Sequence, residues 1–171
     1  QHHKCKCLRG IDMTYDNIVT GTFLKRPNRF IAYVEVKGDV KTCHVKNTGR
    51  CQELLVPGCT VVLEFHPKAK EMKRKTEYDL IAVYKGNLLI NMDSQAPNQA
   101  ALEWIREKEA KGLSLENVGI PTNIRREVTH GESRFDLAFE LKDEVTGKTV
   151  PAFMEVKGVT LEKEGNVFFP D

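Results

Sequence analysis

Two carboxylates and a lysine near the end of the chain have the types and the spacing that divalent-cation chemistry requires. Asp136 opens an alternating apolar run, and Glu155 and Lys157 belong to the later segment Glu-Val-Lys-Gly. Side chains alternate along a strand, so Glu155 and Lys157 share a face, and pairing of the two strands would bring Asp136 to Glu155. Carboxylate oxygens suit Mg²⁺ or Mn²⁺, and such a cation can activate water and stabilise charge on a phosphodiester. The spacing therefore predicts a metal site at Asp136 and Glu155, with Lys157 orienting the water or neutralising the developing charge.

The same tetrapeptide occurs earlier in the chain, so the motif is not specific by itself. Glu35 and Lys37 repeat it, and Asp16 precedes Glu35 by the interval that separates Asp136 from Glu155. Asp16 lies in a polar run before any strand signal, whereas Asp136 opens an apolar strand, and this context favours the later set. The simpler alternative for the later set is an exposed Glu–Lys pair, which contributes about a few tenths of a kcal/mol.

The composition is that of an ordinary soluble globular chain. Its 171 residues are 40% hydrophobic and 29% charged, which fits one large domain or two small ones. No apolar run approaches the roughly 18 residues of a membrane-spanning helix, and no signal peptide precedes the first strand, so no membrane partner is expected. The five cysteines are an odd number in a chain too long to need disulfides, which favours a reduced, cytoplasmic setting.

Charge is distributed unevenly along the chain. Through Lys85 there are 16 Lys and Arg against 9 Asp and Glu, and after it there are 10 against 15. This asymmetry fits a basic binding module followed by an acidic module that supplies cation ligands. Solvated faces without any partner are the alternative explanation.

Residues 1–12 show no apolar periodicity and end just before Met13, so we expect a tag or an extension there. His2, His3, Cys5 and Cys7 are zinc-ligand types, but a terminus without a second ligand pair is not expected to form a functional site. Cys43, Cys51 and Cys59 are too far apart in sequence for a paired-cysteine zinc motif and are interpreted as packed free thiols.

Residues 13–92 are expected to form a small closed barrel. Apolar-rich runs separated by turn signals predict strands at residues 18–24, 30–36, 40–45, 60–65, 78–84 and 88–91. Five or so strands with no helix between them favour an OB-like barrel, with an SH3-like barrel as the alternative.

Two of the expected barrel loops are basic. The first carries Lys25, Arg26 and Arg29, and the second carries Lys73, Arg74 and Lys75 after two further lysines. Such loops can bind a phosphate backbone, and Phe30 and Tyr33 offer stacking surfaces nearby. The alternatives are a solvated lysine-rich loop and aromatic side chains that belong to the core.

Residues 93–171 predict a second module of a different kind. Pro97 and Asn98 are helix-start signals and Gly112 is a stop signal, which gives a helix over residues 98–111. We expect its packed face to be Ala101, Leu102, Trp104 and Ile105. Three antiparallel strands follow, the first beginning at residue 124, and a helix before such strands is typical of restriction-endonuclease-type nucleases. The chain as a whole is therefore expected to be α+β.

Several segments, in their order along the chain, resemble the successive motifs of the sugar fermentation stimulation protein A (SfsA) family. They are residues 42–50, 73–80, 93–98, 133–136, 155–161 and 168–171. The resemblance extends from Tyr15 to Asp171. It implies an OB-like domain followed by a restriction-endonuclease-like PD-(D/E)xK domain, DNA binding, and a nuclease activity that depends on Mg²⁺ or Mn²⁺.

The resemblance also assigns roles to individual residues. Asp136 and Glu155 match the expected metal ligands, Lys157 matches the catalytic lysine, and Glu127 and Asp171 are further acidic candidates. Family members continue after the Phe-Pro-Asp motif with a segment that looks like Ala-x-Thr-x-Arg-Gly and a basic helix, so we expect a C-terminally truncated member whose second domain is incomplete.

The sequence thus predicts phosphodiester hydrolysis by a metal-bound water, with the basic barrel loops holding the strand. The alternatives are a DNA-binding regulator of sugar metabolism genes whose nuclease-like domain is catalytically idle, and a module directed at RNA.

Overall fold

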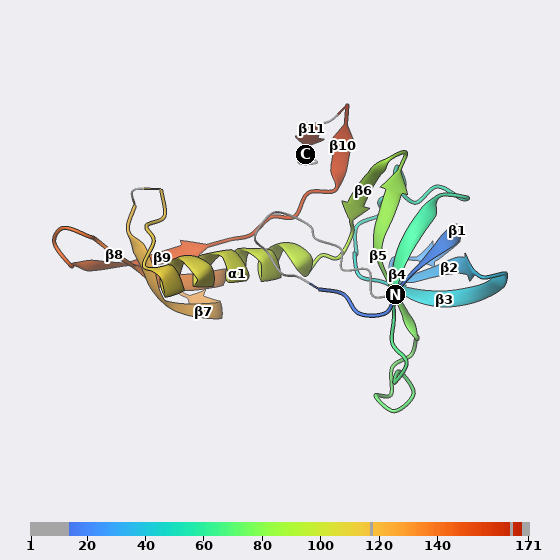
Figure 1. The fold of residues 1–171 in the computed structure, drawn as a ribbon, viewed down its shortest axis with the longest axis horizontal. Helices are drawn as coiled ribbons and strands as arrows, with labels where there is room; N and C mark the ends of the chain where they lie inside the picture. The colour runs from blue at the N-terminus through green and yellow to red at the C-terminus, as the bar shows by residue number, and fades with distance from the viewer. Residues whose placement is uncertain (1–13, 117, 165, 169–171) are drawn as a thin grey trace. The chain divides into compact units, whose positions relative to one another are not determined.

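The structure, a computed structural model, describes residues 14–116, 118–164 and 166–168 (Figure 1). These residues form two compact units. One consists of residues 14–96 together with the described residues from 158 onward, and the other consists of residues 97–157. The predictions for residues 1–12, including their four candidate zinc ligands, and for Asp171 lie outside the described residues.

Six strands make up the main sheet of the first unit. They are β1 (Ile18–Asn28), β2 (Ile31–Val36), β3 (Asp39–Val45), β4 (Thr60–Phe65), β5 (Tyr78–Lys85) and β6 (Leu88–Asn91). Their order is β3-β2-β1-β4-β5-β6, and a parallel pairing of β3 with β5 closes the first five into a barrel. The predicted OB-like barrel is confirmed.

β1 is shared by the two halves of this barrel. Its first half pairs with β4 and its second half with β2, and the ladder with β2 is irregular after Phe23. Gly21 permits the crossing, because a Cβ there would lie 2.6 Å from Val34 Cγ1 and 2.7 Å from the Glu35 carbonyl oxygen. Alternate side chains of β2, namely Ala32, Val34 and Val36, fill the interior.

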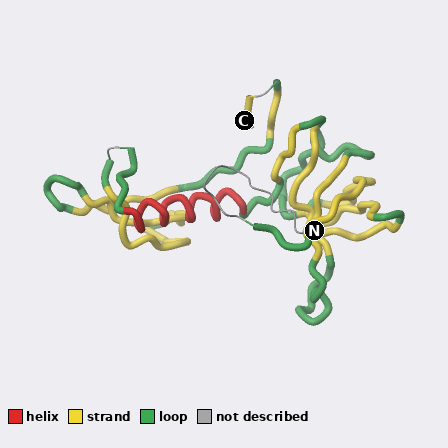
Figure 2. The backbone as a smooth tube through the Cα atoms, in the orientation of Figure 1, coloured by secondary structure: helices red, strands yellow, loops and turns green. Residues whose placement is uncertain are grey.

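The second unit contains α1 (Ala96–Lys111) and three antiparallel strands, β7 (Ile120–His130), β8 (Ser133–Lys142) and β9 (Thr149–Met154), in the order β7-β8-β9. α1 is the only helix within the described ranges and is red in Figure 2. Asp93 prepares its start, since Oδ1 accepts the backbone N–H of Gln95 at 2.9 Å. No helix in these ranges is long and apolar enough to cross a membrane.

One face of this sheet packs on α1. Leu102 and Ile105 of the helix form a core with Leu137 and Phe139 of β8. Two expectations were wrong in detail here. Trp104 does not belong to the packed face, since it is 36% exposed. β7 begins four residues before the expected residue 124, because Pro121 is accommodated on an edge strand, opposite Leu141.

A short hairpin, β10 (Leu161–Lys163) and β11 (Asn166–Phe168), follows the second unit in sequence and is grouped with the barrel unit. Cys43, Cys51 and Cys59 are free thiols, as expected. Burial raises the pKa of the Cys43 thiol to about 12, so this cysteine behaves as a packed apolar side chain.

Candidate functional site

The two predicted metal ligands come together where β9 ends. The ladder of β8 and β9 has Leu137 opposite Met154 as its last pair, so Asp136 and Glu155 occupy the next position on each strand. Adjacent strands lie roughly 4.8 Å apart. The register therefore places the two carboxylate residues side by side, although they are 19 positions apart in sequence.

Glu127 lies on the other side of Asp136. The ladder of β7 and β8 pairs residues 126 and 128 with 137 and 135, which places Glu127 opposite Asp136. Glu127 has a left-handed backbone (φ 50°), which is uncommon for a residue other than glycine, although the register continues on both sides of it. Its carboxylate accepts a hydrogen bond from Arg134 Nη2 at 2.7 Å, and both side chains are exposed.

Asp136 is oriented by two donors. Its Oδ1 accepts a hydrogen bond from Asn98 Nδ2 at 2.9 Å, and its Oδ2 accepts one from the backbone N–H of Val156 at 2.7 Å. Asn98 belongs to the first turn of α1, so the helix that covers the sheet also holds the carboxylate. Each carboxylate oxygen has two lone pairs, and one on each oxygen is left for another ligand.

Glu155 and Lys157 follow the end of β9 at Met154, so strand alternation does not apply to them, but the Lys157 ammonium contacts Glu155 Oε1. Both side chains are more than half exposed. The hydrogen bond with Glu155, its charge and the charge of Asp136 raise the pKa of Lys157 above its usual range. Lys157 is thus a cation next to the acidic pair.

The tightest cluster of metal-ligand types lies elsewhere, on the barrel. Within the part of the chain that the structure describes, the one group of three His, Cys, Asp or Glu ligand atoms within 4.8 Å of one another is Glu64, His66 and Asp79. His66 Nε2 is 2.9 Å from Asp79 Oδ2 and 3.7 Å from Glu64 Oε2. His44 Nδ1 is 3.3 Å from Asp79 Oδ1.

An arginine already pairs with one carboxylate of this cluster. Arg74 Nη2 donates to both Asp79 oxygens, at 2.7 and 2.8 Å, and Asp79 is 3% exposed. Burial raises the pKa of Asp79, but the hydrogen bonds and charges of Arg74 and His66 outweigh it, so the pKa lies below its usual range. These contacts tie the loop of residues 66–77 to β5.

The predicted phosphate-binding residues of the second basic loop differ in whether a protein group already binds them. The Arg74 guanidinium is bound to Asp79, whereas Lys73 and Lys75 on either side of it are exposed. Of the three predicted residues in this loop, Lys73 and Lys75 are the two with exposed side chains.

The first basic loop likewise contains one arginine that is bound by other protein groups. Arg26 Nη1 donates to the carbonyl oxygens of Gly49 and Arg50, at 2.7 and 2.8 Å, and Nη2 donates to those of Arg29 and Asn47, both at 2.6 Å. Arg26 therefore holds β1 to the loop of residues 46–59 and has few donors left for a ligand.

The neighbours of Arg26 face outward and pair with aromatic rings. Lys25 Nζ lies 5.4 Å from the centre of the Tyr33 ring, and Arg29 Cζ lies 4.9 Å from that of Phe30. Phe30 is 46% exposed, so this aromatic is a surface residue and not part of the core.

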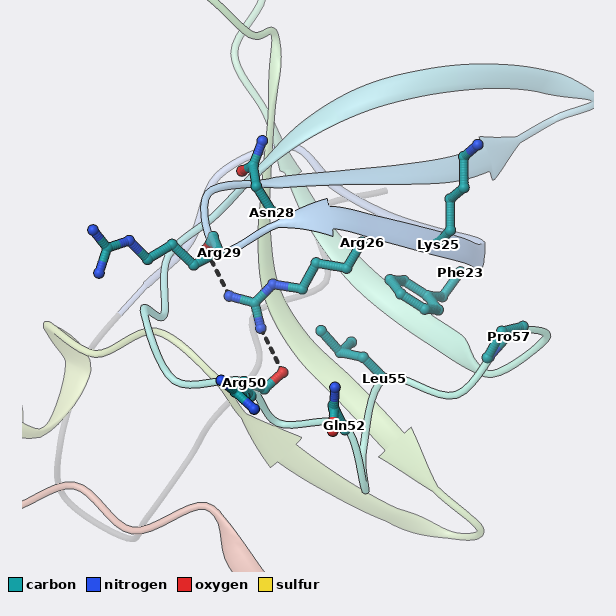
Figure 3. A pocket seen from close by; sticks show the side chains of 9 residues that line it. All are labelled: Phe23, Lys25, Arg26, Asn28, Arg29, Arg50, Gln52, Leu55 and Pro57. Carbon is teal, nitrogen blue, oxygen red and sulfur yellow. Dashed lines mark hydrogen bonds between the residues drawn. The ribbon is translucent and has the colours of Figure 1, made fainter.

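A pocket of about 420 Å³ opens beside β1 in the barrel unit (Figure 3). It is lined by Phe23, Lys25, Arg26, Asn28, Arg29, Arg50, Gln52, Leu55 and Pro57.

Two family models match the chain in tandem. The SfsA N-terminal OB domain matches residues 24–92, and the sugar fermentation stimulation protein RE domain matches residues 95–171. The chain belongs to the SfsA family. A sugar fermentation stimulation protein homolog from Alkaliphilus oremlandii is 54% identical over 160 residues, and one from Desulfitobacterium hafniense (strain Y51) is 50% identical over 159 residues. The alignments cover 93% of this chain and 64% and 62% of those relatives, so the chain spans less than two thirds of their length.

The fold of this SfsA chain is similar to a solved family structure. A structure of Pyrococcus furiosus SfsA in complex with Ca²⁺ matches with a TM-score of 0.72 and 25% sequence identity, over 95% of this chain and 64% of that one. The match covers both units of the SfsA chain, since it leaves only 5% of the residues outside.

Sequence reasoning about this SfsA chain missed three residues around its sites. Asn98 was interpreted only as a helix-start signal, although it lies in a segment that resembles a family motif. His66 and Asp79 were not singled out. The signal available for Asp79 was an acidic residue at the start of the apolar run of β5, where an unpaired carboxylate is costly.

Proposed function

We propose that this SfsA family protein binds DNA through its barrel and hydrolyses phosphodiester bonds with Mg²⁺ or Mn²⁺ held by Asp136 and Glu155. In this proposal residues 13–92 are the nucleic-acid-binding module and residues 93–171 belong to a restriction-endonuclease-like domain. The observation that supports it is the register of β8 and β9, in which Asp136 and Glu155 each adjoin the last pair, Leu137 and Met154, together with the contact between Lys157 and Glu155.

The residues fit a hard divalent cation. Asp136 and Glu155 supply oxygen ligands, and the oxygens of Asp136 are oriented in advance by Asn98 and Val156. When bound, Mg²⁺ or Mn²⁺ supplies Lewis-acid polarisation of the phosphodiester and lowers the pKa of a water. The P. furiosus relative was solved in complex with Ca²⁺, which supports a cation site in the family.

The other residues have separate roles. Lys157 stabilises the negative charge that develops on the phosphate, which its ammonium can do without losing a proton. Glu127 extends the row of acids across the sheet. Its carboxylate joins the outer ligand shell of the cation when it releases Arg134. The exposed cations Lys25, Arg29, Lys73 and Lys75 hold the phosphate backbone.

One observation favours the second candidate, a DNA-binding regulator with an idle nuclease-like domain. Each acid of the row already has a protein partner: Asn98 and Val156 for Asp136, Lys157 for Glu155, and Arg134 for Glu127. Lys157 and Arg134 balance two of the three negative charges and Asp136 accepts two hydrogen bonds, so the row of acids is partly satisfied by the protein itself. The barrel would have the same role in both candidates, with RNA as an additional substrate class to test.

One cleavage assay distinguishes the two candidate functions. The protein, and in parallel a full-length relative, is incubated with single-stranded DNA, duplex DNA and RNA in Mg²⁺ or Mn²⁺. Cleavage that EDTA abolishes and Glu155→Gln removes supports the nuclease. Lys163→Ala is the matched control, because this exposed lysine lies beyond the acidic row, and it should cleave normally. DNA binding without cleavage in any of these reactions supports the regulator.

A further inference from the structure

We infer that the pocket beside β1 binds one nucleotide of a single-stranded nucleic acid. The phosphate contacts Arg29 and Arg50, and the base packs on the apolar residues at the bottom of the pocket. The inference rests on the proposed nucleic-acid binding of the barrel and specifies where and in what form the strand is held.

The charge of the pocket selects an anion. Four of its lining residues are cationic, namely Lys25, Arg26, Arg29 and Arg50, and none of the nine described lining residues carries a carboxylate. Clustered charge of one sign in a recess raises the local concentration of the opposite ion. Arginine in particular matches the geometry of a phosphate with paired donors.

The shape and floor of the pocket select more than a bare phosphate. Its volume of about 420 Å³ lies within the roughly 300–1,000 Å³ of organic-ligand sites. Pro57 is exposed and supplies apolar surface, whereas Leu55 and Phe23 lie deeper, at 7% and 2% exposure, on the same side of the Arg26 guanidinium in Figure 3. Asn28 and Gln52 add amide groups, which can hydrogen-bond the edge of a base.

Arg26 keeps this pocket open to an anion. The carbonyl oxygens of residues 29, 47, 49 and 50 would repel a phosphate, but all four point to the Arg26 guanidinium. The same bonds hold β1 and the loop of residues 46–59 in place, so the site exists before a ligand arrives and less ordering is needed on binding. Arg26 is therefore a positioning residue, whereas Arg29 and Arg50 use only their backbone for this contact and keep their side chains for the ligand.

The surface next to the pocket points to a single strand. Lys25 with Tyr33, and Arg29 with Phe30, place cations beside aromatic rings at the edge of the pocket. Phosphates and bases alternate along a strand, and this alternation of cations and rings matches them. A duplex keeps its bases stacked inside and cannot place one on the floor of the pocket without unpairing it.

The test uses the protein itself, with adenosine 5′-monophosphate, adenosine and inorganic phosphate as probes in calorimetric titrations. The monophosphate should bind at one site and more tightly than either adenosine or phosphate alone. Arg50→Gln and Arg29→Gln should each weaken it roughly tenfold, the effect of losing a charged hydrogen bond, while keeping the carbonyl that Arg26 binds. Lys70→Ala, an exposed charge on the other loop, should leave it unchanged.

Three outcomes overturn the inference: equal affinity for the monophosphate and phosphate, equal affinity for the monophosphate and adenosine, or an unchanged monophosphate affinity in both arginine variants. A short single-stranded oligonucleotide distinguishes a strand from a free nucleotide. The monophosphate should displace the oligonucleotide, and Arg50→Gln should weaken oligonucleotide binding. If Arg50→Gln weakens binding of the monophosphate but not of the oligonucleotide, the pocket is a site for free nucleotides and the strand assignment is overturned. An unaltered protein that binds no oligonucleotide contradicts the proposed function separately, whatever the result with the monophosphate.

Discussion

The orientation of Asp136 by Asn98 can be tested with Asn98→Ala. Asp136 is partly buried and has two described donors, so the substitution removes one of two hydrogen bonds to a charged group. Such a bond contributes about 1.5–3 kcal/mol, and partial exposure reduces this to roughly 1–2 kcal/mol. The corresponding loss of Mn²⁺ affinity is about 5- to 30-fold, which overlaps the lower part of the roughly 10- to 100-fold range seen for outer-shell partners of metal ligands.

Two other effects of this substitution are small. The helix should not be destabilised, since alanine has the highest helix propensity and Asp93, not Asn98, prepares the helix start. The second hydrogen bond to Asp136 should remain, because the backbone N–H of Val156 still donates to Oδ2 at 2.7 Å.

The measurement is a Mn²⁺ titration of the folded protein, followed by calorimetry, with thermal unfolding as the check on the fold. Gln99→Ala is the matched control, because Gln99 is the next residue and its amide donates to Glu103 on the same helix, at 2.7 Å, and not to Asp136. It should bind Mn²⁺ normally. Equal affinity in the unaltered protein and Asn98→Ala would show that the helix does not support the metal ligand.

Three further predictions concern the remaining charged groups. Lys157→Ala should lower metal-dependent cleavage by roughly 100-fold or more while DNA affinity stays within a few-fold, as gel-based rates and anisotropy titrations can show. Lys73→Ala and Lys75→Ala should each reduce the slope of log DNA affinity against log salt concentration by about 0.7–0.9. Arg74→Ala should instead lower the free energy of unfolding by about 2–4 kcal/mol, because it leaves buried Asp79 without its main partner. The pKa of Asp79 is depressed in the folded state, so its contribution to stability is present above the unfolded pKa of about 3.9 and is lost as the pH falls through the folded pKa. At pH values below about 4, the urea concentration at the unfolding midpoint should therefore decrease more steeply with pH in the unaltered protein than in Asp79→Asn.

Local patterns in the sequence were sufficient for much of the fold. The barrel strands were expected from apolar runs between turn residues, because a half-buried strand needs alternating side chains and a turn needs Gly, Pro or Asn, and both requirements are local. The acidic pair and its lysine were predicted from spacing alone and stay a prediction, and Glu155 and Lys157 lie beyond the end of β9 rather than on the expected strand. Where local signals conflicted, as with Pro121 near the start of β7, the strand boundary was misplaced.

The roles of the arginines depend on tertiary contacts that no local pattern contains. Arg26 and Arg74 are as basic as Arg29 and Lys73 and stand near them in sequence, so composition assigned all of them to a phosphate backbone. The partners of Arg26 include carbonyl groups 21 to 24 positions away, which become its neighbours only when the loop of residues 46–59 folds back on β1. Arg74 meets Asp79 only because Asp79 starts β5 and is closed in by the loop. Burial makes an unpaired carbonyl or carboxylate costly, and this cost, which depends on packing and not on local sequence, determines which cations are held by the protein and which remain for a ligand.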